Sequence, residues 1–162
     1  QPANNRLYLY VADDVFKEER HHSKHSSHNF HLKINDSSAY FGNVRLDIEK
    51  SENDSFYLKM DFIARGETSK EAIDLAKNIN YGFAQEDSLL KFNTYYSITN
   101  QKWRNQHVKI TLKVPEGKSV HLGEATEQII YDVRNTTNTL DYEMVGKTWT
   151  MTKEGLACGD GK

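Results

Sequence analysis

The stretch HVKITLKVP, residues 107–115, decides the fold class, because apolar and polar side chains alternate along it without interruption. Its apolar positions are Val108, Ile110, Leu112 and Val114. Successive side chains of a β-strand point to opposite faces of a sheet, so this period of two predicts a strand with one buried and one solvated face. Pro115 cannot donate a backbone hydrogen bond, and we expect it to end the strand.

The same alternation recurs along much of the chain. It is seen in RLYLYVA (6–12), NFHLKIN (29–35), NVRLDIEK (43–50), SFYLKMDFIARG (55–66) and SVHL (119–122). Strands of this kind, separated by polar turns, make an all-β sandwich, barrel or solenoid. The polar turn KSENDS, residues 50–55, joins two strongly patterned strands, and we expect those two strands to be neighbours in one sheet.

One segment follows a helical period instead. In TSKEAIDLAKNI, residues 68–79, the apolar positions are Ala72, Leu75, Ala76 and Ile79. Thr68 and Glu71 have the spacing of a capping box, so we predict one short α-helix near residues 69–79, docked on the sheet. The remaining pattern predicts a helical turn at 124–128 and a last strand in KTWTMT, residues 147–152. We expect residues 1–162 to form a single β domain, with a polar His-rich loop at 13–29.

Composition narrows the possible partners and the setting. The formal net charge is −2, so no basic excess indicates binding of nucleic acid. Cys158 is the one cysteine, which excludes a disulfide within the chain. No apolar run reaches the roughly 18 residues of a membrane span, and no signal-peptide layout is present. Because the sequence starts almost directly with a strand pattern, we expect a fragment of a longer protein.

Four segments together resemble a known family. They are GNVRLDIEKS (42–51), ARGETSKEAIDLAKNINY (64–81), VKITLKVPEGKSVHL (108–122) and DVRNTTNTLDYEMVGKTWTMTKEGLAC (132–158). This chain resembles the C-terminal soluble domain of Bacteroidetes membrane proteins that carry an N-terminal phage-shock-protein-C domain. The likeness runs from Gly42 to Cys158 and is most specific in residues 76–81 and 144–156. The pattern LKVPEGKSVHL is also similar to the rungs of β-solenoid domains in adhesin heads and cell-wall-stress sensors.

The resemblance implies a solenoid-like β fold in an envelope-stress or regulatory setting. It also implies a membrane anchor N-terminal to this sequence, which would tether the domain to the bacterial inner membrane, on the periplasmic face. It implies no catalytic residues and no cofactor. Relatives often end in two cysteines separated by two residues, whereas here Gly161 stands in the second place after Cys158. A redox or metal role of such a pair is therefore not expected.

Histidine is concentrated in HHSKHSSHNFH, residues 21–31, which contains His21, His22, His25, His28 and His31. On a strand, the same-face pair His25 and His31 would be about 20 Å apart, too far to share one zinc ion. A helix would align His21, His25 and His28, but the SSHN stretch favours a turn. A solvated loop is the favoured interpretation, and a metal site and a proton-responsive patch are the alternatives.

Aromatic side chains fall on the polar faces of predicted strands or in loops. They are Tyr8, Tyr10, Tyr57, Tyr95 and Trp103, the last followed by Arg104. Exposed aromatic residues can mark a surface that contacts protein or carbohydrate, and we predict that these six residues form an interaction surface. The other interpretation, which the solenoid expectation favours, is that the rings stack as ladders that hold successive rungs together.

No motif indicates catalysis. The sequence contains neither a GxSxG nucleophile elbow nor a GxxxxGK[ST] phosphate loop, and the acidic pairs at 13–14 and 18–19 are typical of a solvated face. We therefore predict an all-β domain, β-solenoid-like with a sandwich as the alternative, that is a non-catalytic sensory or protein-interaction domain. Its partner would be another protein or a second copy of itself, with no nucleic acid and with contact to the membrane only through the anchor.

Two alternative functions stay open. An adhesin-like module that binds glycans or surface polymers requires a row of exposed aromatic residues over a groove. A metal-binding domain requires at least three of the imidazoles of residues 21–31 within about 2.1 Å of one ion.

Overall fold

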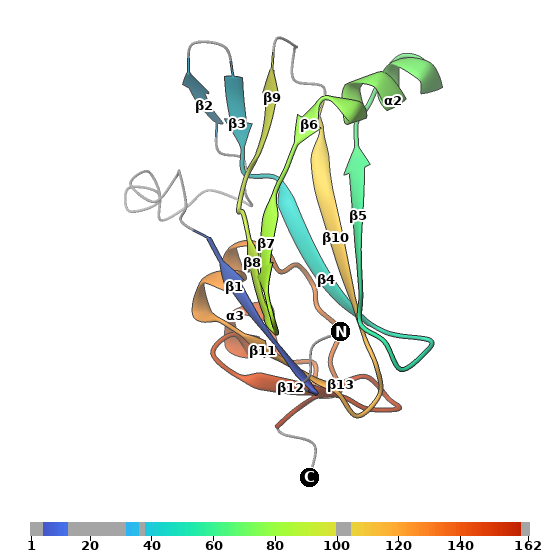
Figure 1. Ribbon diagram of the computed structural model, residues 1–162, viewed down its shortest axis with the longest axis vertical. Helices are drawn as coiled ribbons and strands as arrows, with labels where there is room; N and C mark the ends of the chain where they lie inside the picture. The colour runs from blue at the N-terminus through green and yellow to red at the C-terminus, as the bar shows by residue number, and fades with distance from the viewer. Residues whose placement is uncertain (1–4, 13–31, 36–37, 100–104, 160–162) are drawn as a thin grey trace.

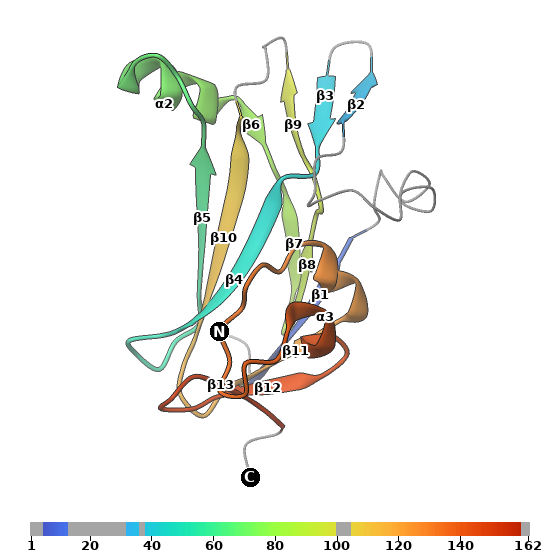
Figure 2. The ribbon, with the colours of Figure 1, turned by 180° about the vertical axis from the view of Figure 1, so that it is seen from behind.

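The computed structural model describes residues 5–12, 32–35, 38–99 and 105–159. These residues are mostly β, with few helices, as the alternating patterns predict (Figures 1 and 2). The described strands form three sheets, of which two lie face to face and the third lies at one end. The His-rich stretch predicted as a loop at 13–29 lies outside the described residues.

The largest sheet has six strands in the order β13-β12-β11-β1-β8-β7. Its strands are β1 (Arg6–Val11), β7 (Phe83–Glu86), β8 (Leu89–Phe92), β11 (Ser119–Leu122), β12 (Thr148–Met151) and β13 (Leu156–Cys158). Strand β1 runs parallel to both of its neighbours, so that Leu9 lies beside Leu122 of β11 and Leu90 of β8. The other pairs of this sheet are antiparallel.

The second sheet has the order β4-β10-β5, with β4 (Val44–Lys50), β10 (His107–Val114) and β5 (Tyr57–Ile63). Strand β10 is parallel to β4 and antiparallel to β5. The prediction that the turn at 50–55 joins neighbouring strands is therefore wrong, because β10 lies between them. The six residues between Lys50 and Tyr57 are enough to cross two strand spacings, about 10 Å.

The third sheet, at the top of Figure 1, has the order β2-β3-β9-β6. Its strands are β2 (Leu32–Asn35), β3 (Ser38–Phe41), β6 (Ile79–Asn80) and β9 (Tyr96–Thr99). Every neighbouring pair in it is antiparallel.

The predicted helix is present as α2 (Ser69–Lys77), which contacts β5. It is shorter than predicted, because Ile79 leaves the helix and is buried in β6. The helical turn predicted at 124–128 is confirmed as the 3-10 helix η1 (Glu124–Gln128). A second short α-helix, α3 (Asp141–Met144), was not predicted.

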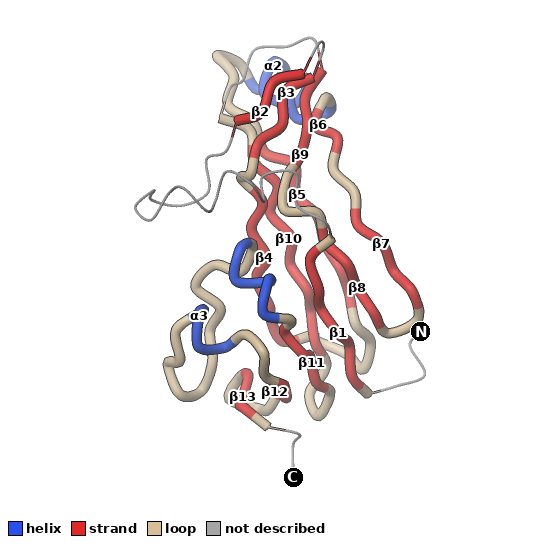
Figure 3. Tube along the Cα trace, turned by 90° about the vertical axis from the view of Figure 1, so that its left-hand side faces the viewer, coloured by secondary structure: helices blue, strands red, loops and turns tan. Residues whose placement is uncertain are grey.

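The core lies between the facing sides of the six-stranded sheet and the β4-β10-β5 sheet (Figure 3). Strands β1, β8 and β11 of one sheet and β4 and β10 of the other contribute apolar side chains of their alternating patterns that are 0–4% exposed. They include Leu7, Leu9, Leu90, Phe92, Val120 and Leu122 on one side, and Val44, Leu46, Ile48, Val108, Ile110, Leu112 and Val114 on the other. The polar residues of the same strands therefore point to the outside of the molecule. The alternating apolar side chains of β5 are less covered than predicted, since Leu58 and Met60 are half-buried and Phe62 is 41% exposed.

Candidate functional site

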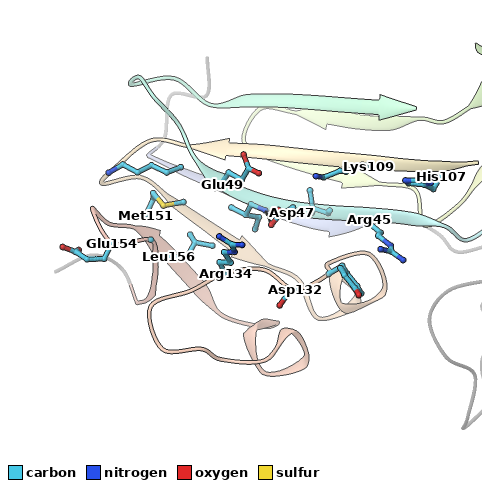
Figure 4. Close-up of a pocket in the computed structure, with 15 residues that line it drawn as sticks. Arg45, Asp47, Glu49, His107, Lys109, Asp132, Arg134, Met151, Glu154 and Leu156 are labelled. Carbon is cyan, nitrogen blue, oxygen red and sulfur yellow. Dashed lines mark hydrogen bonds between the residues drawn. The ribbon is translucent and has the colours of Figure 1, made fainter. Parts of the chain in front are cut away.

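A groove of about 670 Å³ follows the outer face of β4 and β10. Figure 4 shows Arg45, Asp47 and Glu49 on β4, with Lys109 and His107 on the neighbouring strand β10. These side chains point outward because the residues between them on β4, Leu46 and Ile48, point into the core. The floor of the groove is thus the polar half of the same alternation that builds the core.

The opposite wall is the chain that follows η1. Residue 46 of β4 binds this segment through its backbone, since Leu46 N donates to Ile129 O over 2.7 Å and Tyr131 N donates to Leu46 O over 3.3 Å. The carboxylate of Asp141 then accepts hydrogen bonds from the backbone N–H groups of Asp132 and Val133, at 2.7 and 3.0 Å. These contacts hold the wall at a fixed distance from β4.

Charges of both signs line the groove in equal number. The basic residues are Arg45, Lys50, Lys109 and Arg134, and the acidic residues are Asp47, Glu49, Asp132 and Glu154. A site for nucleic acid or another polyanion carries a basic excess. A groove with alternating, balanced charge instead favours a surface that has both acidic and basic side chains, as the surface of a folded protein or a peptide has.

Two contacts order the polar floor. The guanidinium of Arg45 lies 4.3 Å from the centre of the Tyr131 ring, which places a cation on the face of an aromatic side chain and links β4 to the wall. Oδ1 of Asp47 accepts a hydrogen bond of 2.8 Å from the backbone N–H of Ile48.

Asp47 is the half-buried carboxylate of the groove. Burial raises the pKa of Asp47, because desolvation disfavours the charged form. The hydrogen bond from Ile48 acts in the opposite direction, as do the charges of Lys109 and Arg134, whereas Glu49 adds to the rise. The groove thus holds one carboxyl group whose charged form is disfavoured by burial.

Two of the predicted interaction residues, Tyr8 and Tyr10, lie together on the outer face of the six-stranded sheet. Their ring centres lie 5.9 and 6.3 Å from that of His121 on β11. Tyr10 is 39% exposed, and Tyr8 is half-buried. The parallel pairing of β1 with β11 causes this meeting, because it puts residue 8 in register with residue 121.

The other predicted aromatic residues lie elsewhere. Tyr57 stands on β5 in the opposite sheet, 51% exposed, and its hydroxyl accepts a hydrogen bond of 3.1 Å from Asn53 Nδ2. Tyr95 precedes β9 in the third sheet and makes an edge-on contact with Tyr40, with ring centres 5.6 Å apart. Trp103 and Arg104 lie outside the described residues. The four predicted tyrosines that the structure describes are therefore spread over β1, β5 and the segment before β9.

The five histidines predicted as metal ligands, His21, His22, His25, His28 and His31, also lie outside the described residues, so their role stays a prediction. Among the residues that the structure describes, no three His, Cys, Asp or Glu side chains are grouped in a way that could hold a metal ion. Cys158 is an exposed free thiol at the end of β13.

Sequence reasoning missed the charged groove. Its residues come from four segments, 45–50, 107–109, 131–134 and 151–156, that are far apart in the chain. The alternation of Arg45, Asp47 and Glu49 shows which side of β4 is wet, but no local pattern shows that residues 131–134 form a wall beside it. That wall depends on backbone hydrogen bonds to β4, which leave no signal in the side-chain pattern.

The fold and the groove define a mostly β domain with a polar outer face. The model of one family, described as the ToastRack found in some PspC, matches residues 32–162. The chain belongs to this family. The match confirms the expected relation to a C-terminal domain associated with PspC proteins. No curated protein and no solved structure matches the chain.

None of the described helices is long and apolar enough to cross a membrane.

Proposed function

We propose that this chain is a non-catalytic sensory and protein-interaction domain of an envelope-stress membrane protein of the phage-shock-protein-C type. The observation that carries the proposal is the charged groove on the outer face of β4 and β10, in a chain that belongs to the PspC ToastRack family. The wall at residues 129–131 is bonded to β4 by backbone hydrogen bonds, and the groove beside it is a polar surface that suits recognition of another protein.

The finer parts of the proposal concern the setting. The fold is solenoid-like, which the parallel pairs of β1 with β8 and β11, and of β4 with β10, support. The parent protein is a Bacteroidetes inner-membrane protein, and an anchor N-terminal to this sequence holds the domain on the periplasmic face. The resemblance of residues 42–158 supports this setting.

A protein partner is favoured over the adhesin-like alternative. A glycan-binding module needs aromatic rings in one row along a groove. Here Tyr8 lies on β1, Tyr57 lies on β5 of another sheet and Tyr95 precedes β9, and none of the three lines the charged groove. The balanced charge also gives no preference for an anionic surface polymer.

The test uses the full-length membrane protein in its host, with a transcriptional reporter of envelope stress. Lys109→Glu combined with Arg134→Glu reverses two exposed charges of the groove, and we expect the reporter response to stress to be lost. The matched control, Lys70→Glu with Lys91→Glu, makes the same charge change at exposed positions outside the groove and keeps the response. A groove variant that is expressed and folded and that responds like the wild type contradicts the proposal.

A further inference from the structure

Strand β5 is an open edge of the β4-β10-β5 sheet. Among the described residues no strand pairs with its outer side, since β10 is its one neighbour in that sheet. The other edge of the sheet is covered, because the backbone of Leu46 bonds to residues 129 and 131. An open edge presents unpaired N–H and C=O groups that can pair with a further strand.

The apolar side of β5 is only partly covered. Leu58, Met60 and Phe62 lie in register with Leu112, Ile110 and Val108 of β10 and share their face of the sheet. The three residues of β10 are at most 1% exposed, whereas Leu58 and Met60 are half-buried and Phe62 is 41% exposed. The edge strand therefore keeps an apolar face that a further strand would extend and cover.

The polar side of β5 carries one charge of each sign. Lys59 Nζ lies 3.3 Å from Asp61 Oδ2, and the two side chains are 66% and 37% exposed. Met60 stands midway between them in the sequence. A strand with a cation and an anion placed symmetrically about a central residue is complementary to an antiparallel copy of itself.

We propose that two copies of this chain associate through antiparallel pairing of their β5 strands, centred on Met60. This inference rests on the proposed interaction function and names a second copy as a partner of the domain. Lys59 of each copy lies opposite Asp61 of the other, which forms two cross-strand ion pairs. On the apolar side, Leu58 lies opposite Phe62, and the two Met60 side chains meet at the two-fold axis.

The charges select this register among the alternatives. Centring the pair on Lys59 or on Asp61 places like charges directly opposite each other, which is destabilising. Centring it on Leu58 or Phe62 leaves no Lys59–Asp61 pair. A shift by one residue puts the apolar side of one strand on the polar side of the other.

Helix α2 gives the second copy a further contact. A groove of about 530 Å³ lies between β5 and α2, lined by Phe62 and Ile63 of the strand and by Ile73 and Ala76 of the helix. Ile73 is 55% exposed. In the antiparallel pair, Tyr57 of the second copy lies beside Ile63 and enters this groove, where its ring covers Ile73.

Sedimentation velocity with charge variants tests the pairing. The wild-type chain sediments as a dimer across a concentration series. Asp61→Lys gives two lysines per strand and Lys59→Asp gives two aspartates, so each variant alone sediments as a monomer. A 1:1 mixture of the two variants restores the dimer, because the two lysines of one chain then face the two aspartates of the other. A wild-type monomer, or a dimer that neither variant weakens, overturns the proposal.

The register is tested by cysteine cross-linking in a Cys158→Ser background. Met60→Cys places two thiols directly opposite each other, with Cα atoms about 5.5 Å apart, and forms a disulfide-linked dimer on mild oxidation. Ile63→Cys is the matched control on the same strand, because its two copies lie about 20 Å apart in this register. Equal cross-linking at both positions, or none at Met60→Cys, contradicts the proposed register.

The outcome separates this inference from the proposed function. Lys59 and Asp61 do not line the charged groove, so the sedimentation results bear on β5 pairing and not on the groove. The stress response of the Lys109→Glu, Arg134→Glu variant bears on the groove and not on β5 pairing. A monomer that still needs the groove for its stress response refutes self-association alone.

Discussion

Single side chains on the wet face of β4 tune the stability of the fold. Asp47 illustrates this, because burial raises its pKa above the ordinary value of 3.8. The folded chain therefore holds the proton of Asp47 more tightly than the unfolded chain does. This difference in pKa adds to the free energy of unfolding. The added stability is fully present below pH 3.8 and is lost as the pH rises through the folded-state pKa of Asp47.

Asp47→Asn removes the charge and keeps an oxygen that can accept the hydrogen bond from Ile48. Because solvent screens this half-exposed group, we expect the variant to be more stable than the wild type at pH 7 by only about 0.5 kcal/mol or less. The difference should vanish below pH 3.8. Urea unfolding of both proteins from about pH 3 to pH 8 measures it. A variant that is less stable than the wild type at pH 7, or a stability difference that does not change with pH, contradicts the raised pKa of Asp47.

The pKa of Glu116 is shifted in the opposite direction to that of Asp47, so Glu116 serves as a control for the pH dependence. Its Oε2 lies 2.6 Å from Lys50 Nζ, and this hydrogen bond and charge lower the pKa of Glu116 below 4.5. Because the folded-state pKa of Glu116 is lowered, its ionised form stabilises the fold above pH 4.5. This stability is lost as the pH falls through the folded-state pKa. Glu116→Gln is therefore expected to be less stable than the wild type at pH 7 and to converge with it in acid.

Gly123 marks a place where two segments approach closely. A Cβ atom there would lie 2.7 Å from Cδ1 of Tyr10 and 3.0 Å from the backbone oxygen of Leu9. Its backbone φ is −60°, so the need for glycine comes from space and not from an unusual conformation. The sequence shows a glycine here but not the ring that excludes a side chain.

We expect Gly123→Ala to destabilise the fold by about 1–3 kcal/mol, because a buried methyl group would displace β1 or its tyrosine. Chemical denaturation measures the change. Gly82→Ala is the matched control, since its Cβ would meet only Asn93 Nδ2 at 3.4 Å, and it should differ little from the wild type. Equal effects of the two substitutions would contradict the close packing at Gly123.

At the scale of the element, the start of α2 follows from its sequence. The hydroxyl of Thr68 accepts a hydrogen bond of 3.1 Å from the backbone N–H of Glu71, as the predicted capping box requires. The carboxylate of Glu71 reaches one residue further back than in the standard box, and accepts a hydrogen bond of 2.7 Å from Glu67 N. The helix buries no residue fully, so its caps matter to its stability.

Thr68→Ala should destabilise α2 by about 1 kcal/mol, because it leaves the N–H of Glu71 without its acceptor. Hydrogen exchange measures the effect locally: amides of residues 71–77 should exchange faster, while those of β10 should keep their protection. Thr68→Ser retains the hydroxyl and serves as the control. Uniform loss of protection across the chain would show that the cap supports the whole fold and not the helix alone.

The strands show where element prediction from sequence fails. Alternation located β1, β4, β10 and β11, because each has one face in the core. It also located β5, whose Leu58 and Met60 pack against the core but are only half-buried. The hairpin of β7 and β8 was missed, since all four residues of β7 are exposed and give no alternating burial. Its two-residue turn contains Asp87 at φ 51°, a conformation that aspartate tolerates and that the sequence alone does not reveal.

At the scale of the whole molecule, the order of the strands is what the sequence could not supply. The turn at 50–55 suggested that β4 and β5 pair, but β10, the longest strand of this sheet, takes the central place between them. Likewise β1 pairs with β8 and β11, which lie about 80 and 110 residues later in the chain. Such pairings depend on how well whole sheet faces pack, and the local sequence of a strand does not indicate its partner.

This topology produces the surfaces that the domain offers. The parallel pair of β4 and β10 faces the core with apolar residues and forms the floor of the charged groove with polar ones. The segment at 129–131 closes one edge of the same sheet, and the other edge, β5, stays open among the residues that the structure describes. Recognition of a partner protein at the groove is the central claim.

Site-specific photo-cross-linking in intact cells tests that claim most directly. A photoreactive amino acid replaces Tyr131, which lines the groove and is 47% exposed, in the full-length protein, and Tyr142, 58% exposed and outside the groove, is the control position. The account predicts a discrete cross-linked partner protein at residue 131, absent at residue 142, whose yield changes when the envelope is stressed. The same adducts at both positions, or none at residue 131, would contradict it.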